Sequence, residues 1–147
     1  MAKTIKISIL GFLLISPVLL SAQTAGELEV ILETQSISNA QALAFVLGSL
    51  DMKVPNAFDQ ALVYGWFPPG TAPEDPITLR SLSFLMMQAF VINGGLMYRL
   101  FPGPRYAYRT MLSRSFIQGA ADPYMRVSGE RFLLILGNVL NAAGGEE

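Results

Sequence analysis

The chain has 147 residues, of which 52% are hydrophobic and only 14% are charged, and it contains neither cysteine nor histidine. These absences exclude disulfides, thiolate nucleophiles, Ser-His-Asp triads, ordinary zinc sites and haem held by an axial histidine. The 10 basic and 11 acidic side chains nearly balance, which does not favour nucleic acid as a partner. We therefore expect a binding protein that is not an enzyme and that uses no metal or cofactor.

Residues 1–22 have the three-part form of a signal peptide. Two lysines precede an apolar run, Ile7 to Leu20, which is too short to span the roughly 30 Å of hydrocarbon in a bilayer. Ser21-Ala22 then supplies the small residues that signal peptidase requires. We expect cleavage after Ala22, which leaves no membrane-spanning segment. Residues 23–147 would form one exported domain, in the periplasm or, alternatively, at the cell surface. The alternative to cleavage is an uncleaved membrane anchor.

Charge is unevenly distributed along the exported part. Residues 23–79 carry one lysine against seven acidic residues, whereas residues 80–131 carry all seven arginines against two acidic residues. The nearly neutral total thus conceals an acidic half and a basic half.

Three segments have the pattern of a helix start followed by a buried helix. Each begins with a β-branched apolar residue and then Ser38, Thr78 or Ser128, whose side-chain oxygen can accept a hydrogen bond from an unpaired N–H of the first turn. The apolar residues that follow occupy more than one helix face, which is typical of buried helices. The pattern predicts core helices over residues 38–50, 78–92 and 128–142.

Each core helix is preceded by a shorter and more polar helical stretch, over residues 27–33, 57–66 and 106–117. Asn93-Gly94-Gly95 is expected to end the second core helix with a left-handed residue. Because such a helix pair cannot bury its apolar helix alone, we predict an all-α fold of three helix-loop-helix repeats around a central three-helix bundle.

The second and third units share a turn containing glycine, a loop containing proline, and a β-branched residue with a Ser or Thr cap before an apolar helix. In the second unit these residues are Tyr64-Gly65-Trp66, Asp75-Pro76-Ile77-Thr78 and Leu82-Ser83-Phe84-Leu85, and in the third they are Phe116 to Gly119, Asp122-Pro123 and Val127 to Phe132. This pattern resembles the S-layer homology (SLH) module, which occurs in sets of three in envelope proteins, and the first unit matches it only at its core helix. The resemblance covers roughly residues 26–142 and implies a three-pronged helical fold and an envelope location.

The chain departs from the SLH pattern directly after each helix cap. In the family, the cap residue is followed by an arginine within a Thr-Arg-Ala-Glu-like motif that helps to bind anionic cell-wall polysaccharide. Here the residues after the caps are Asn39, Leu79 and Gly129. Arg80 and Arg131 lie one and two positions further along, so we expect them to point in other directions. The resemblance therefore implies the fold more strongly than the ligand.

A stretch of alternating arginine and aromatic residues is the main candidate for a binding surface. Guanidinium groups pair with carboxylates or phosphates, tyrosine rings stack on sugars or cations, and both residue types dominate protein–protein interfaces. In the alternative reading, the rings pack on the core while the arginines are solvated or pair with the acidic half. The candidates are Tyr98, Arg99, Phe101, Arg105, Tyr106, Tyr108, Arg109 and Arg114.

The loop from Tyr64 to Pro76 is a second candidate, because it holds the single tryptophan, Trp66, next to Phe67. Exposed, these rings would form an interaction loop; folded back, they would seal the end of the bundle.

We expect an exported adaptor in a periplasmic or surface protein assembly, which binds an envelope protein through residues 98–114. The alternative is SLH-like attachment to an anionic cell-wall polysaccharide or peptidoglycan through Arg99, Arg105 and Arg109.

Overall fold

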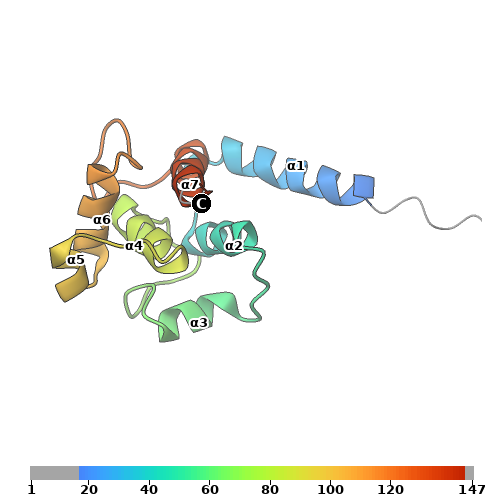
Figure 1. Ribbon diagram of the computed structural model, residues 1–147. Coiled ribbons are helices and arrows are strands. Elements are labelled where there is room, and N and C mark those ends of the chain that lie inside the picture. Colours follow the sequence, from blue (N-terminus) through green and yellow to red (C-terminus); the bar gives the residue numbers. More distant parts are fainter. Residues whose placement is uncertain (1–16, 145–147) are drawn as a thin grey trace, which may run out of the picture. The chain divides into compact units, whose positions relative to one another are not determined.

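The computed structural model describes residues 17–144, with side chains from residue 25 onward, and over this range it is all-helical with no strand. The predicted all-α class is therefore confirmed. The helices are α1 (Pro17–Glu33), α2 (Asn39–Ser49), α3 (Ala57–Val63), α4 (Leu79–Ala89), α5 (Leu96–Leu100), α6 (Pro104–Ser113) and α7 (Gly129–Gly144) (Figure 1).

The chain divides into two units after Val30. In the first unit, the described residues belong to α1, and the predicted cleavage point after Ala22 lies within this helix. Most of the predicted signal peptide, residues 1–16, lies outside the described residues, so export and cleavage stay predictions. Among residues 17–144, no helix combines the length and the apolar character needed to cross a bilayer.

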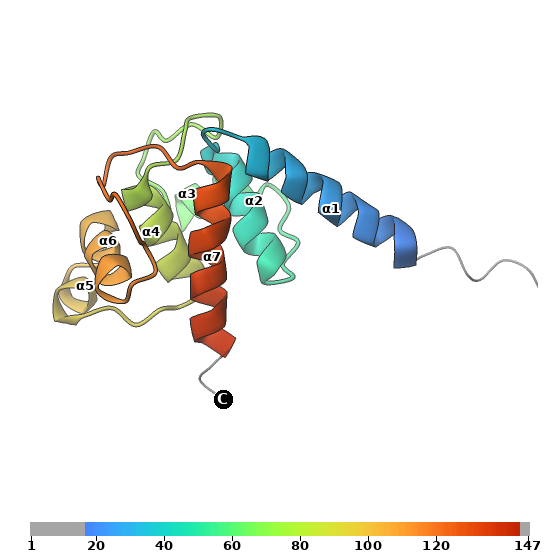
Figure 2. The same cartoon turned by 90° about the horizontal axis from the view of Figure 1, so that it is seen from above.

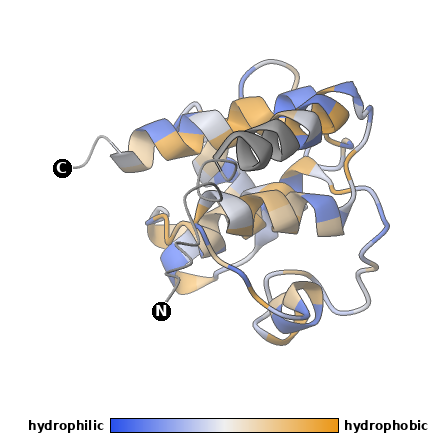
Figure 3. Cartoon of the chain, turned by 90° about the vertical axis from the view of Figure 1, so that its right-hand side faces the viewer, coloured by the Kyte–Doolittle hydropathy of each residue, from blue (hydrophilic) through white to orange (hydrophobic). Residues whose placement is uncertain are grey.

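The core of the second unit is built on α2, α4 and α7, which start within one residue of the three predicted core helices. Figures 1 and 2 both show α7 beside α2 and α4. The rings of Phe45 on α2 and Phe132 on α7 meet edge to face at 6.1 Å. Every residue from Leu82 to Met87 on α4 is buried, as expected of a helix that is apolar on several faces. Figure 3 shows orange, hydrophobic stretches along the helices.

The predicted caps start the core helices. The Ser38 hydroxyl accepts a hydrogen bond from the N–H of Gln41, whose side chain in turn accepts one from the Ser38 N–H, a reciprocal capping box. Thr78 accepts from the N–H of Ser81 (3.2 Å), and Ser128 accepts from that of Arg131 (3.3 Å). Local sequence therefore sets where these helices begin.

A closed ring of backbone hydrogen bonds joins the segments in front of the three core helices. The N–H of Ile37 donates to the carbonyl of Val127 (3.0 Å), that of Ile77 to Ile37 (3.0 Å), and that of Val127 to Ile77 (3.2 Å). All three side chains are fully buried. The ring thus brings three segments that are distant in sequence to one point.

Beside this ring, two loops cover the starts of α2 and α4 in the same way. In the first junction (residues 38–40 with 72–76), the N–H groups of Asn39 and Ala40 donate to the carbonyls of Asp75 and Pro73, both at 2.9 Å. These bonds satisfy N–H groups that a helix start otherwise leaves unpaired.

In the second junction (residues 78–80 with 121–126), the N–H of Leu79 donates to Met125 (3.0 Å) and that of Arg80 to Pro123 (2.9 Å). The backbone bonds match those of the first junction one for one. The donor residues lie forty positions further along the chain, and the acceptor residues lie fifty positions further along.

The end of α4 differs from the prediction. The helix stops at Ala89, and Val91 rather than Asn93-Gly94-Gly95 takes the left-handed conformation, with φ of +52°. The N–H of Ile92 closes the turn on the carbonyl of Met87 (3.0 Å), the six-to-one bond of a Schellman motif. The assignment of the helix stop to Asn93-Gly94-Gly95 was therefore wrong. The sequence also did not predict α5.

Candidate functional site

Helix α6 presents three of the predicted site residues on one face. Arg105, Tyr108 and Arg109 follow the i, i+3, i+4 spacing of a helix face, while Ala107 and Met111 on the other side are fully buried. Contact between α6 and α4 fixes this orientation. The amphipathic pattern of α6 therefore decides which of its residues can meet a ligand.

The loop of the second junction is held from several directions. The Asp122 carboxylate accepts a hydrogen bond from the N–H of Tyr124 (2.8 Å), and the Tyr108 hydroxyl donates to the carbonyl of Ala121. The Arg131 guanidinium, from α7, donates to the carbonyls of Gln118 and Ala120. These bonds place Pro123 and Tyr124 in front of α6.

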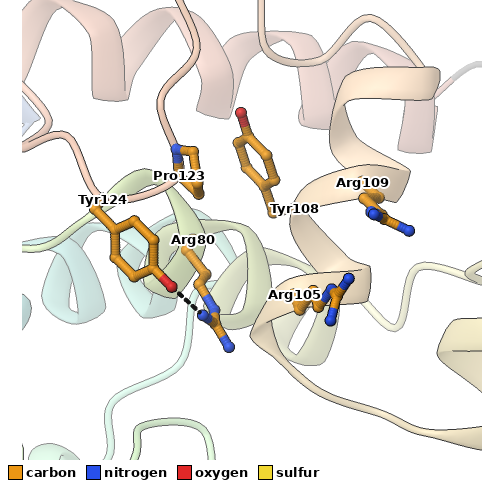
Figure 4. Close-up of a pocket in the computed structure, with 6 residues that line it drawn as sticks. All are labelled: Arg80, Arg105, Tyr108, Arg109, Pro123 and Tyr124. Atoms are coloured by element: carbon orange, nitrogen blue, oxygen red, sulfur yellow. Dashed lines mark hydrogen bonds between the residues drawn. The ribbon is translucent and has the colours of Figure 1, made fainter.

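A pocket of about 400 Å³ lies where α6, this loop and the start of α4 meet. We call it the arginine groove. Arg80 donates through Nη1 to the Tyr124 hydroxyl at 2.9 Å, and its guanidinium lies 5.7 Å from the centre of the Tyr124 ring. Figure 4 shows Tyr124, Arg80 and Arg105 across the pocket. The groove is lined by Arg80, Arg105, Tyr108, Arg109, Pro123 and Tyr124.

The arginines of the groove have no ion-pair partner among the described residues. No acidic residue lines the groove, and no carboxylate in the described part of the chain forms an ion pair with Arg80, Arg105 or Arg109. Asp122, the one acid in the loop of the second junction, accepts a hydrogen bond from the Tyr124 N–H and forms no ion pair with the arginines of the groove. Three guanidinium groups with free donors suit an anionic ligand, and the two tyrosine rings offer apolar faces on which a sugar ring can stack.

The structure places the other predicted residues outside the groove. Tyr98 is buried, with its ring edge to face on Phe84 at 6.5 Å and its hydroxyl bound by the Gln88 side-chain amide at 2.7 Å. Burial raises the pKa of the Tyr98 hydroxyl, and the hydrogen bond from Gln88 lowers it by a smaller amount. Tyr106 is half-buried against the core, 5.9 Å from the Arg105 guanidinium. Both rings pack as the alternative reading expected.

The remaining candidates of the stretch are exposed. Arg99 and Phe101 lie on and just after α5, away from the groove lining. Arg114 donates to the carbonyl of Asn93 at 2.6 Å, which ties the end of α6 to the segment between α4 and α5.

Trp66 and Phe67 seal the bundle rather than form an exposed loop. Phe67 is 1% exposed and packs against Phe58 with ring centres 5.1 Å apart, and Trp66 is partly buried against the same core. The second of the two readings of this loop therefore describes it better.

Sequence analysis missed half of the groove, namely Arg80, Pro123 and Tyr124. Arg80 was noted but was expected to point elsewhere, whereas the bond from its N–H to the Pro123 carbonyl draws the loop over it. The repeat offered a signal for Arg80. In both junctions, the residue two positions after the cap donates its backbone N–H to the loop that precedes the next cap.

A scan against protein-family models matched none of them to this chain, and searches of curated proteins and of solved structures found no match either.

Proposed function

We propose that this protein is an exported, non-enzymatic binding protein of the bacterial envelope, which attaches to an anionic cell-wall glycan through the arginine groove. The observation that carries the proposal is the meeting of Arg80, Arg105 and Arg109 around one pocket with two tyrosines and no acid. Each guanidinium can donate two parallel hydrogen bonds to a carboxylate or phosphate on the polymer.

We also propose that the second unit is a divergent SLH-like arrangement of three helix-loop-helix repeats around a three-helix bundle. Its support is the closed ring of Ile37, Ile77 and Val127, together with the matched bonds at the two junctions. Such a ring is what three related units around a common axis would form, each donating to the unit before it in the chain and the first donating to the last.

Burial gives a reason for the absence of the family's arginine after each cap. Asn39, Leu79 and Gly129 are all buried, so a guanidinium there would have to be desolvated and paired. In this chain the basic groups come instead from Arg80 and from α6. The proposed ligand site thus uses positions different from those that the SLH motif would supply.

The adaptor function, which was the first expectation from the sequence, becomes the second proposal. It was expected to use residues 98–114, but Tyr98 is buried and Tyr108 and the arginines of α6 line the groove. The exposed side chains of Val63 and Tyr64 at the end of α3 are 83% and 71% exposed and could serve such a partner.

Sedimentation with purified cell-wall sacculi tests the proposal. The wild-type chain should sediment with sacculi at low salt and be released at high salt, because the guanidinium contacts are screened. The triple variant Arg80→Ala, Arg105→Ala and Arg109→Ala should stay in the supernatant. Arg126→Ala, an exposed arginine that does not line the groove, is the matched control and should sediment normally. If the wild type does not sediment, the glycan function is wrong and the adaptor remains.

A further inference from the structure

A second surface of the basic half is apolar and exposed. Helix α5 buries only Tyr98, while its remaining apolar side chains face outward and continue into Phe101. Leu96, Leu100 and Phe101 are 69%, 59% and 62% exposed. We call the following residues the α5 face, none of which lines the arginine groove: Val91, Leu96, Met97, Leu100 and Phe101.

Val91 differs from the other left-handed non-glycine residues that the structure describes, because its side chain is apolar. Four non-glycine residues of the described part have positive φ, and the other three, Asp51, Asn56 and Ser115, are polar. A β-branched residue is strained in this conformation, and the side chain of Val91 is 81% exposed, so it adds little to the core. The turn that ends α4 requires a left-handed residue but not an exposed apolar one, so the valine at this position adds to the apolar surface rather than to the stability of the turn.

The sequence on either side of α5 carries charge of one sign. Between Pro76 and Ala121 the sequence contains no acidic residue and no lysine, but five arginines, of which Arg99 belongs to α5 itself. A second copy docking through the same face would bring these like charges together. An anionic bilayer fits both features, because apolar side chains can enter the interface while guanidinium groups bind lipid phosphates.

We propose that the α5 face inserts into the surface of an anionic lipid bilayer. This goes beyond the glycan-binding function and uses different residues. Tyr98 holds the short helix against α4 through its contacts with Phe84 and Gln88. The exposed apolar side chains of α5 are therefore fixed in position relative to the core. Arg99, next to Leu100, contacts the headgroups as the ring of Phe101 enters the interface.

Vesicle binding by the full chain tests the proposal. Binding to vesicles of equal phosphatidylglycerol and phosphatidylcholine should exceed binding to phosphatidylcholine alone by at least about tenfold, and should fall with salt. The variant Leu100→Ser with Phe101→Ser should bind the anionic vesicles at least about tenfold more weakly, because it loses the buried apolar area. Val63→Ser removes an even more exposed apolar side chain, at the end of α3 and outside the α5 face, and should bind anionic vesicles as the wild type does.

Val91→Gly separates binding from folding. Glycine accepts positive φ without strain, so this variant should melt at a higher temperature than the wild type and yet bind anionic vesicles about threefold more weakly. In Phe101→Trp, the emission of the added tryptophan should shift to the blue when anionic vesicles are mixed with the protein, because the indole ring leaves water. These two variants keep the test decisive if the double serine variant does not fold.

Three results would overturn the proposal. One is equal binding to both vesicle types or to neither. Another is undiminished binding by the double serine variant and Val91→Gly. The third is concentration-dependent dimerisation that Leu100→Ser abolishes, which would assign the face to a second copy. None of these results depends on sacculus sedimentation, so failure here leaves the glycan proposal standing.

Discussion

The two junctions have the same backbone and opposite surfaces. At each, the first two N–H groups of a core helix donate to a loop that ends in the next β-branched ring residue. In the first junction, the helix offers Ala40 and the loop offers Glu74, whereas the corresponding residues of the second junction are Arg80 and Tyr124. Hydrogen bonding therefore builds the junction, and side chains that the backbone does not constrain decide whether it forms a basic groove.

The buried position beside each loop shows the same division. Asn39 in the first junction donates through its side chain to the Ala72 carbonyl at 2.9 Å, which ties the loop down. Leu79 in the second junction is apolar and fully buried, so that loop is held instead by Tyr108, Arg131 and Asp122. The second loop is thus held by side chains of α6 and α7 rather than by the helix start that it covers.

The largest effect is expected at the start of α7, two residues after Val127 of the ring. A Cβ on Gly129 would overlap the backbone carbonyl of Ile31, and the Gly129 N–H donates to the carbonyl of Thr34 at 2.8 Å. Gly129→Ala should therefore lower the free energy of unfolding by about 3 kcal/mol, measured by chemical denaturation, and should disturb both junctions together.

Gly137→Ala is its matched control. A Cβ at this position of α7 meets nothing within 4 Å, so alanine should raise stability by about 0.5 kcal/mol through helix propensity. Equal losses for the two variants would show that the close approach of Gly129 to the Ile31 carbonyl does not limit stability.

Arg80→Ala should have the next largest effect, on binding rather than on stability. Arg80 supplies one guanidinium to the groove and holds Tyr124 through a 2.9 Å hydrogen bond. Loss of one charge-assisted contact should cost about 2 kcal/mol of binding to the anionic polymer, measured by titration with soluble wall fragments. Ala40→Arg in the first junction should give no comparable gain, since Asp59 and Glu74 supply negative charge in that half.

Asn39→Ala should affect only the first junction. It removes the bond to the Ala72 carbonyl and should lower the free energy of unfolding by about 1.5 kcal/mol, while glycan binding at the second junction stays unchanged. A parallel loss of binding in this variant would contradict the independence of the two junctions.

The smallest effect concerns Tyr98 and pH. Its pKa is raised in the folded chain by burial, so the unfolded chain ionises first as pH rises past about 10. The stabilisation is complete below that pH and is lost as pH increases toward the folded-state pKa. Tyr98→Phe should weaken the loss of stability between pH 9 and 11, measured by urea denaturation. An identical pH dependence in the variant and the wild type would show that Tyr98 ionises freely in the folded chain.

Local sequence was sufficient for the core of this fold. A cap residue accepts a hydrogen bond from an N–H only three residues further along the chain. Ser38, Thr78 and Ser128 therefore mark helix starts without reference to the rest of the chain. Continuous apolar runs likewise predicted that α4 would be buried on several faces. The export signal and the SLH resemblance were also drawn from local patterns, and they stay predictions.

The composition and spacing of the chain by themselves determined an all-α fold, three core helices and a basic region rich in aromatic residues. Tertiary structure decided which of those residues meet. Arg80 and Tyr124 are 44 positions apart and touch only because the Pro123 carbonyl binds a backbone N–H at the start of α4. Tyr98 and Tyr108 look alike in sequence, yet one is buried under α5 and the other lines the groove, because the packing of each helix against α4 decides which of its faces stays open to solvent.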